Sequence, residues 1–276
     1  MASTSGSSEA IAVLIEVGAS ERVHVVDLVP GTVKIRGLGI LDPFEVIAPI
    51  PHGATVTIGQ KVLRRVPARL PELLQGMNRR AQTISPKDAG AFIAKMGIGG
   101  KDQVLEAGLG SAALSLHILR CLGDGGRLVS MERREEHAEV GMTNIERLRA
   151  SGGMLGSHHL VLGDAHHPPE AVRAMGPYDA IILDLPEHAP AIHALGPHLD
   201  QGGRIGCYCP VTSQVEAVID AFEATGLTLE WAGELIERPW GRASKGGMRP
   251  VNGPFGHTAF LVIGTRSAGD SDRLSA

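Results

Sequence analysis

Short apolar runs separated by turn residues fill the N-terminal quarter of the chain. Between residues 10 and 67 the runs are AIAVLIEV, RVHVVDLV, TVKIRGLGI, FEVIAPI and ATVTIG, and Gly, Pro or Asp stands between them. Strands of four to eight residues at this close spacing are typical of an all-β unit. We therefore predict a small β-domain over residues 10–68. The Ser/Gly/Ala-rich residues 1–9 and the polar tail 267–276 are predicted to be disordered.

The pattern changes to a helical one after residue 68 and then alternates. Two helical segments predict connector helices within residues 69–100. From residue 101 to 266, helical patterns alternate with the apolar runs QVLEAG, RLVSME, HLVLGD, DAIILDLP and RIGCYCP. This alternation is typical of an α/β fold with a mostly parallel sheet. The last two apolar runs, LTLEWAGEL and TAFLVIG, are predicted to form an antiparallel pair at one edge.

Composition narrows the class of protein. The chain has 276 residues, 43% hydrophobic residues and a net charge of −4, so it can bury a core and has no overall positive field for a polyanion. No stretch is apolar enough to span a bilayer and the N-terminus lacks a signal peptide, which excludes a membrane protein and favours the cytoplasm. Three cysteines without a CxxC pattern exclude a disulfide framework. The histidine pairs 158–159 and 166–167 lack metal-ligand spacing, so no metal site is expected.

A glycine motif follows the first strand of the alternating region. VLEAGLGSA places Gly108 and Gly110 between a buried strand and a helix, where glycine lets a ligand approach the backbone. Glu132 ends the next strand, 22 residues after Gly110, near the spacing at which a carboxylate binds a ribose diol. Ala113 occupies the position of a third glycine, and no P-loop lysine follows. The motif therefore favours S-adenosylmethionine over a dinucleotide or a triphosphate, with a tight strand-to-helix turn as the alternative interpretation.

Six blocks of sequence resemble the tRNA adenosine N1-methyltransferase family of the class I methyltransferases. They are RRAQTISPKDAGAF, VLEAGLGS, MERREEHAEVGMTNIERL, AIILDLP, CYCPVTSQVEAV and RPVNGPFGHTAFLV, in the order and spacing of that family. The resemblance extends from about residue 10 to 266. It implies a class I methyltransferase Rossmann-like sheet with a small N-terminal β-domain, S-adenosylmethionine as cofactor, tRNA as acceptor and a homotetramer. The cofactor-binding domain would span residues 101–266.

The resemblance also implies a set of site residues. Asp184 of LDLP would lie in the acceptor pocket as the catalytic residue, where its carboxylate stabilises the positive charge that the acceptor gains. Glu132 would accept hydrogen bonds from the ribose hydroxyls and Asp164 one from the adenine amino group. A helix-capping role for Asp184, and structural roles for Glu106 and Gln82, are the alternatives. The implied cofactor-binding residues are Gln82, Glu106, Gly108, Gly110, Ser111, Glu132, Arg133 and Asp164.

On the acceptor side the chain departs from the family pattern. Ser85 replaces the aromatic residue of IYPKD, and the family's LDLPEPW is LDLPEHA here, which keeps Glu187 but introduces His188. With His257 of GHTAF, these form the predicted substrate-binding set. The changes leave three hypotheses open: methylation of a ring nitrogen of adenosine in tRNA, methylation of a small free purine- or pteridine-like heterocycle by a diverged paralogue, and a noncatalytic cofactor-binding subunit.

Overall fold

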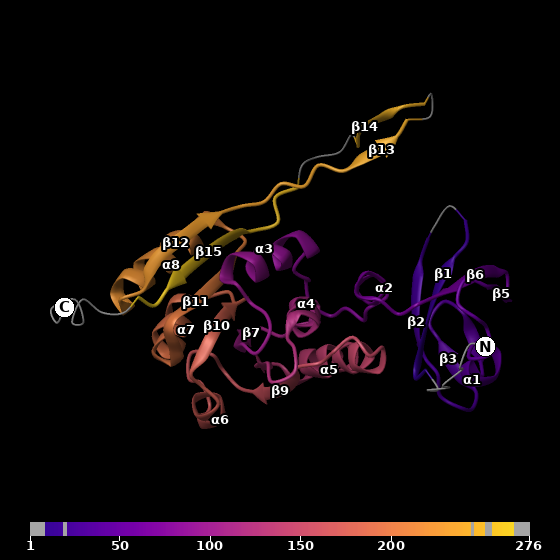
Figure 1. The fold of residues 1–276 in the computed structure, drawn as a ribbon, viewed down its shortest axis with the longest axis horizontal. Helices are drawn as coiled ribbons and strands as arrows, with labels where there is room; N and C mark the ends of the chain where they lie inside the picture. Colours follow the sequence, from indigo (N-terminus) through magenta and orange to yellow (C-terminus); the bar gives the residue numbers. More distant parts are fainter. Residues whose placement is uncertain (1–8, 19–20, 244–245, 252–255, 268–276) are drawn as a thin grey trace.

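The computed structural model describes residues 9–18, 21–243, 246–251 and 256–267. Most of the N-terminal and C-terminal segments that the sequence predicts to be disordered lie outside these residues. The chain forms a β-rich N-terminal unit and a larger α/β unit, joined by short helices (Figure 1).

The N-terminal unit is built on a four-stranded antiparallel sheet in the order β2-β1-β6-β5. Its core contains Ala12, Leu14 and Leu63 from the sheet and Ile47, which directly follows the short helix at residues 43–46. Gly and Pro turns separate the strands, which keeps each one short. The elements are β1 (Ile11–Glu16), β2 (Val23–Asp27), β5 (Thr55–Ile58), β6 (Lys61–Val66), the hairpin β3 (Val33–Ile35) and β4 (Gly39–Leu41), and the short helix α1 (Pro43–Val46).

Two helices connect the units. Helix α2 spans Leu70–Gln75 and α3 spans Pro86–Met96. Local signals define α3: Ser85 is its N-cap, Pro86 fills its first turn, and Gly97 ends it in the left-handed conformation at φ 73°. Phe92 and Met96 are buried against the large sheet.

The large unit has a seven-stranded sheet in the order β12-β15-β11-β10-β7-β8-β9. Strand β15 is antiparallel to β12, as the sequence predicts, and it is also antiparallel to β11, while the pairs among β7 to β11 are parallel. The predicted mostly parallel α/β fold is thus confirmed. The strands are β7 (Gln103–Ala107), β8 (Arg127–Glu132), β9 (Ser157–Leu162), β10 (Tyr178–Leu183), β11 (Leu199–Cys209), β12 (Thr228–Gly233) and β15 (Phe260–Thr265).

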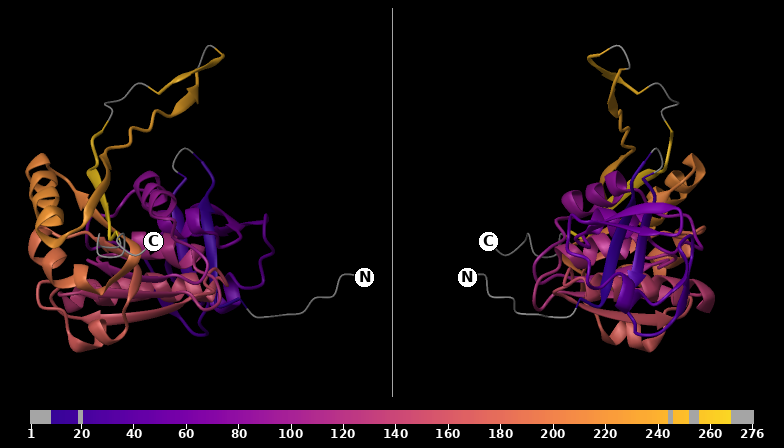
Figure 2. Two further views of the ribbon diagram at one scale, coloured as in Figure 1. Left: turned by 60° about the vertical axis from the view of Figure 1, so that its left-hand side comes forward. Right: turned by 90° about the vertical axis from the view of Figure 1, so that its right-hand side faces the viewer.

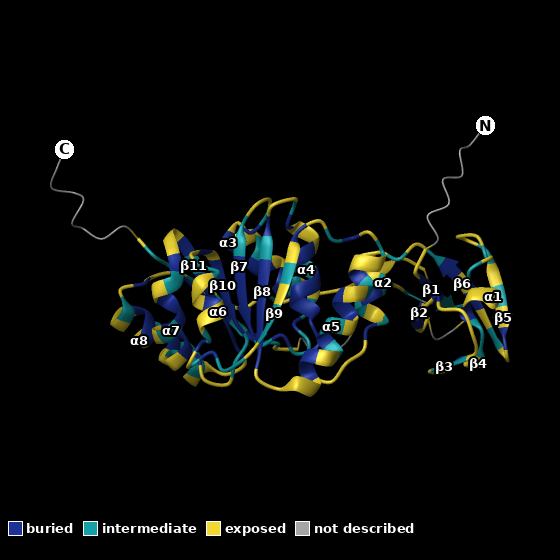
Figure 3. Ribbon diagram, turned by 90° about the horizontal axis from the view of Figure 1, so that it is seen from below, coloured by how far each residue is buried: buried dark blue, intermediate teal, exposed yellow. Residues whose placement is uncertain are grey.

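Helices cover both faces of this sheet, and its central strands are buried (Figure 3). One apolar cluster packs α3, α4 and α5 on one face, and a second packs α6, α7 and α8 on the other. Burial on both faces explains why the strands are continuous apolar runs in the sequence. The remaining helices are α4 (Ala113–Cys121), α5 (Glu135–Ala150), α6 (Glu170–Ala174), α7 (Ala189–Leu195), a 3-10 turn (Gly196–His198) and α8 (Thr212–Thr225). No helix in the described ranges is both long and apolar enough to cross a membrane.

A hairpin arm projects from the large unit between β12 and β15 (Figures 1 and 2). It consists of β13 (Trp240–Arg242) and β14 (Met248–Pro250), which pair antiparallel. Trp240 and Met248 are 60% and 63% exposed. The hydrophobic pattern did not predict this hairpin, since its strands have three residues each.

Candidate active site

The strand order of the large sheet reverses between β7 and β10. In open α/β sheets, ligands bind at such a reversal, outside the carboxyl ends of the strands. Gly108 follows β7 and Asp184 follows β10, and the Asp184 N–H donates to the carbonyl of Ala107 at 2.9 Å. Gly108 has a φ of +100°, and a Cβ there would lie 2.2 Å from the carbonyl oxygen of Asp184. Only glycine fits this contact, which brings the two strand ends together.

Glu132, at the end of β8, holds the glycine loop. Its side chain is buried, and Oε2 accepts a hydrogen bond from the N–H of Gly110 at 3.0 Å. Oε1 accepts from the N–H groups of Arg133 and Arg134 at 2.9 and 3.0 Å. A carboxylate offers about four acceptor positions, so Oε2 keeps one for a ligand. The Glu132 carboxylate therefore lies directly beside the glycine loop.

Two cavities of about 200 and 270 Å³ adjoin at this point. Both are lined by Gly108, Glu132, Arg134 and Asp184. The first also contains Gln82, Gly110 and Ser111, and the second Arg133, Asp164 and Glu187. Small-molecule sites usually have about 300 to 1,000 Å³, so the two cavities together have the size of one ligand site. Asp184 lies at their shared wall.

Carboxylates crowd this wall, and the pKa values of Asp184 and Glu106 are raised. Burial raises the pKa of Asp184 to about 6, and the negative charge of Glu132 adds to the shift. Glu106, in β7, lines neither cavity. It accepts hydrogen bonds from the hydroxyls of Ser115 and Ser130, yet burial raises its pKa to about 7, with contributions from Asp184 and Glu132. The site therefore suits a cation.

Asp164 borders the second cavity after β9. Its Oδ1 accepts from the backbone N–H of His166 at 3.0 Å, and this hydrogen bond is the main cause of a lowered pKa. The carboxylate is thus ionised and fixed in direction. His166 Nε2 lies 3.1 Å from the carbonyl oxygen of Glu187, which ties the loop after β9 to the loop after β10.

Ser111 lines the first cavity, but its hydroxyl forms its hydrogen bonds with the loop before α3. It is buried, and its Oγ accepts from the N–H groups of Arg80 and Ala81 at 3.0 and 3.1 Å. Asn144 of α5 completes the attachment: its side chain bonds the N–H and carbonyl of Asn78 at 3.0 and 2.9 Å and the carbonyl of Ser111 at 3.0 Å. The segment 78–81, called the strap here, is thereby fixed over the glycine loop. Sequence reasoning did not identify Asn144 as part of the site.

Of the predicted substrate-binding residues, Glu187 lines the second of these two cavities, while Ser85, His188 and His257 line neither. Ser85 caps α3, and its Oγ donates to Asp88 Oδ2 at 2.8 Å. His188 is buried with Nε2 at 3.1 Å from the carbonyl of Tyr208. His257 is exposed, with its Nδ1 2.8 Å from Glu234 Oε2 and its Nε2 2.9 Å from the carbonyl of Pro210, which lines the first cavity. These three residues contact the loops around the site.

Tyr208 is a cavity residue that sequence reasoning missed. It lies near the end of β11, beside β10, lines the first cavity and is largely buried. Burial and the charges of Asp88 and Asp184 raise the pKa of its hydroxyl to about 12, so the phenol stays neutral. An aromatic ring thus stands in the cavity wall although Ser85 carries none. Its position at the carboxyl end of a strand adjacent to Asp184 was the available signal.

The arrangement fits S-adenosylmethionine. The close approach at Gly108 and the positive φ of Gly110, 52°, leave backbone exposed to a ligand, and Glu132 and Asp164 offer acceptors on either side. The crowded carboxylates match a sulfonium cation. Within the described ranges, no cluster of three or more His, Cys, Asp or Glu side chains is placed to hold a metal ion.

Comparisons with known proteins agree with this geometry. A model of the family described as tRNA methyltransferase complex GCD14 subunit matches residues 65–240. The chain is 31% identical over 199 residues to the tRNA (adenine(58)-N(1))-methyltransferase TrmI of Thermus thermophilus, covering 70% of this chain and 72% of that protein. It is 28% identical over 214 residues to the tRNA (adenine(57)-N(1)/adenine(58)-N(1))-methyltransferase TrmI of Methanocaldococcus jannaschii, covering 70% and 74%.

Solved structures share the fold over nearly the whole chain. The tRNA (m1A58) methyltransferase TrmI of Aquifex aeolicus superposes with a TM-score of 0.68 at 24% identity, covering 94% of this chain and 98% of that one. A SAM-dependent O-methyltransferase of Thermotoga maritima gives a TM-score of 0.75 at 23% identity, covering 95% of both. The family model and the sequence identity together decide the assignment. The chain belongs to the tRNA methyltransferase complex GCD14 subunit family and is an S-adenosylmethionine-dependent methyltransferase.

Proposed function

We propose that this enzyme methylates N1 of adenine in tRNA. The observation that carries the proposal is the carboxylate of Asp184, which stands at the shared wall of the two cavities, next to the glycine loop and Glu132. The names of the TrmI relatives support the same acceptor.

The cofactor side of the proposal uses the glycine loop and its neighbours. Oε2 of Glu132 accepts a hydrogen bond from a ribose hydroxyl, and Asp164 accepts one from the adenine amino group of the cofactor. Gln82 and Ser111 line the first cavity and Arg133 lines the second. Ser111 also holds the strap, and Glu106 accepts a hydrogen bond from Ser115 without lining either cavity. When bound, S-adenosylmethionine supplies an electrophilic methyl group.

On the acceptor side, Asp184 is the proposed catalytic residue. Its carboxylate accepts a hydrogen bond from the exocyclic amine of adenine and so directs the adjacent N1 lone pair toward the methyl group. As the new N–C bond forms, the ring gains positive charge, which the fixed carboxylate stabilises in a partly dry site. Glu187 lies on the same wall, Tyr208 supplies an aromatic surface, and Ser85, His188 and His257 fix the surrounding loops.

A polynucleotide acceptor has a structural basis near the site. Arg79 and Arg80 are exposed on the strap, directly before Ala81 and Gln82 of the first cavity. Exposed cations at the rim of a catalytic cavity favour a phosphate-bearing substrate over a neutral free heterocycle.

We further propose that the enzyme forms a homo-oligomer and that it acts in the cytoplasm. The hairpin arm exposes Trp240 and Met248, and Ile236 and Val251 near its base are 65% and 51% exposed. Apolar side chains of this size on a projecting ribbon favour burial against another copy of the chain, in a homotetramer by resemblance to the family. Cys121, Cys207 and Cys209 are free thiols, which fits a reducing compartment.

The test is methyl transfer from labelled S-adenosylmethionine to unmodified tRNA, beside a pool of free purines and pteridines. We expect label at N1 of adenine in tRNA, and a fall of roughly 100- to 1,000-fold in rate for Asp184→Asn, because the amide cannot stabilise the cationic ring. Label only in the small-molecule pool would overturn the RNA acceptor. Cofactor binding without any transfer would instead indicate a noncatalytic subunit.

A further inference from the structure

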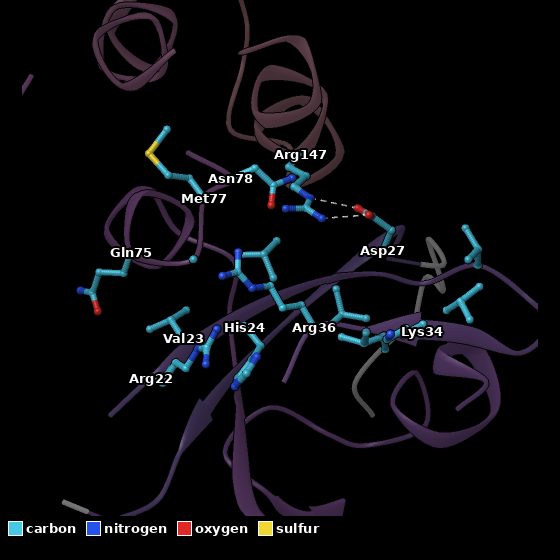
Figure 4. Close-up of a pocket in the computed structure, with 16 residues that line it drawn as sticks. Arg22, Val23, His24, Asp27, Lys34, Arg36, Gln75, Met77, Asn78 and Arg147 are labelled. Atoms are coloured by element: carbon cyan, nitrogen blue, oxygen red, sulfur yellow. Dashed lines mark hydrogen bonds and ion pairs between the residues drawn. The ribbon is translucent and has the colours of Figure 1, made fainter. Parts of the chain in front are cut away.

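A third cavity, of about 410 Å³, lies where the β-domain meets the helices of the large unit (Figure 4). Side chains of β2 and of the segment around β3 form one wall, while the end of α2, the start of the strap and α5 form the other. We call this cavity the junction groove. The residues that the following paragraphs use are Arg22, Lys34, Arg36, Gln75, Asn78 and Arg147.

Positive charge is concentrated in the junction groove. Arg22, Lys34 and Arg36 are exposed, and no described residue forms an ion pair with any of the three. Arg147 is paired with Asp27, with Nη2 3.0 Å from Oδ2 and Nε 3.2 Å from Oδ1. Asp27 is the single carboxylate of the lining, against four cationic side chains. A concave surface with one sign of charge focuses the field and attracts an anion.

The Arg22 side chain lies against the turn between β3 and β4. Gly37, in the turn between β3 and β4, has a φ of +84°, and a Cβ there would lie 3.1 Å from the His24 ring and 3.5 Å from the Arg22 guanidinium. The turn therefore packs on both side chains. His24 is in turn fixed by Glu16, whose Oε1 lies 2.8 Å from its Nε2.

The groove is rigidly connected to the active site. Asn78 lines the groove and Ala81 lines the first catalytic cavity, so the two sites share the strap. Three residues of chain span at most about 11 Å between Cα atoms. Asn144 holds Asn78, and Ser111 holds Arg80 and Ala81, which fixes the spacing between the sites. Arg79 and Arg80, which lie between Asn78 and Ala81 and are exposed, add positive charge between the two sites.

We propose that the junction groove binds the phosphodiester backbone of the RNA acceptor and so positions the target base at Asp184. Guanidinium and ammonium groups are suited to phosphate oxygens, and the amides of Gln75 and Asn78 add hydrogen-bond donors. The cavity is larger than either catalytic cavity, and Asn78 at the start of the strap lines it, which fits a chain of phosphates rather than one small anion. This inference rests on the proposed RNA acceptor.

The experiment compares two triple variants of the full-length enzyme with the same loss of charge. Arg22→Gln/Lys34→Gln/Arg36→Gln removes the free cations of the groove. Arg64→Gln/Lys101→Gln/Arg173→Gln removes exposed cations that line neither the groove nor the catalytic cavities. Binding of unmodified tRNA is measured at several salt concentrations, with thermal melting and S-adenosylmethionine binding as checks on folding.

We expect the groove variant to bind tRNA about tenfold more weakly, with a salt slope smaller by about 2, because three phosphate contacts are lost. KM for tRNA should rise while affinity for S-adenosylmethionine is unchanged. The control should keep most of the wild-type slope. A wild-type slope in the groove variant, or an equal fall in the control, would overturn the groove while leaving the tRNA activity standing. Wild-type enzyme that does not methylate tRNA would overturn the proposed function and the groove with it.

Discussion

The catalytic cavities and the junction groove carry opposite charge, and they differ in how that charge is solvated. The cavities are lined by Glu132, Asp164 and Asp184, which are buried or partly buried, whereas the groove exposes Arg22 and Lys34 to water. Burial raises the pKa of Asp184, so its ionised form reduces stability, while exposed cations cost little. The net charge of −4 reveals neither the acidic cavities nor the basic groove, because it is summed over the whole chain. The difference matches a cationic cofactor on one side and a polyanion on the other.

Among the changes that test this comparison, substitution of Glu132 is expected to have the largest effect, and the effect is on cofactor binding. Glu132→Ala removes the ribose acceptor and the group that holds Gly110, so the dissociation constant of S-adenosylmethionine should rise roughly 10- to 100-fold by calorimetry. Glu187→Ala is the matched control, since it removes an exposed carboxylate from the second cavity without touching the glycine loop. Equal losses in both variants would show that overall negative charge, and not the Glu132 contact, binds the cofactor.

Substitution of Glu106 tests how much a buried carboxylate reduces the stability of the folded state. Its pKa is raised from 4.5 to about 7, so the folded state disfavours its ionised form. Below about pH 4.5 the group is protonated in both the folded and unfolded states and causes no loss. As the pH rises from about 4.5 to about 7, Glu106 ionises in the unfolded state but resists ionisation in the folded state, so the free energy of unfolding falls. Glu106→Gln still accepts from Ser115 and Ser130, and it should gain about 2 to 3 kcal/mol over wild type at pH 8.

Denaturant unfolding at pH 8 and pH 4.5 checks the Glu106 prediction. Most of the gain should vanish at pH 4.5, where Glu106 is neutral in the folded state. A gain that is the same at both pH values would assign it to packing. S-adenosylmethionine should stabilise wild type more than the variant, because its cation offsets the crowded negative charge.

The pH dependence of methyl transfer should sharpen the role of Asp184. Its carboxylate is the active form and its pKa is about 6, so kcat/KM for S-adenosylmethionine should fall about tenfold for each pH unit below 6. The sulfonium cation lowers that pKa when bound, so kcat should decline at a lower pH. The residual rate of Asp184→Asn should lack this inflection. An inflection that persists in Asp184→Asn would belong to another group.

The cofactor side of the site was largely accessible from the sequence, since it depends on local order. Gly108 and Asp184 each follow a buried strand and Glu132 ends one, and the carboxyl ends of parallel strands meet at one edge of the sheet. The alternation of strands and helices predicted that sheet, including its antiparallel last strand. The acceptor side was less accessible. Ser85 and His188 are chemically suitable, but tertiary packing turns them toward a helix end and a strand carbonyl.

The junction groove was inaccessible for a related reason. Arg22 and Arg147 are 125 positions apart, and neither periodicity nor motif spacing relates them. The average charge even argued mildly against a polyanionic partner. Likewise, Ser111 and Asn144 meet only because α5 packs beside the glycine loop, and their hydrogen bonds to the strap depend on that packing.

The smallest expected effect concerns the link between the two regions. Ser111→Ala leaves the N–H groups of Arg80 and Ala81 without their hydroxyl acceptor, which should cost about 1 kcal/mol and lower the melting temperature by roughly 2 to 4 °C. Because the strap then moves independently of the glycine loop, single-turnover methyl transfer should slow several-fold although tRNA still binds. Ser151→Ala, which removes a hydroxyl bond to the Leu148 carbonyl at the end of α5, is the matched control. If both variants lose stability equally and neither slows transfer, the strap does not couple the groove to Asp184.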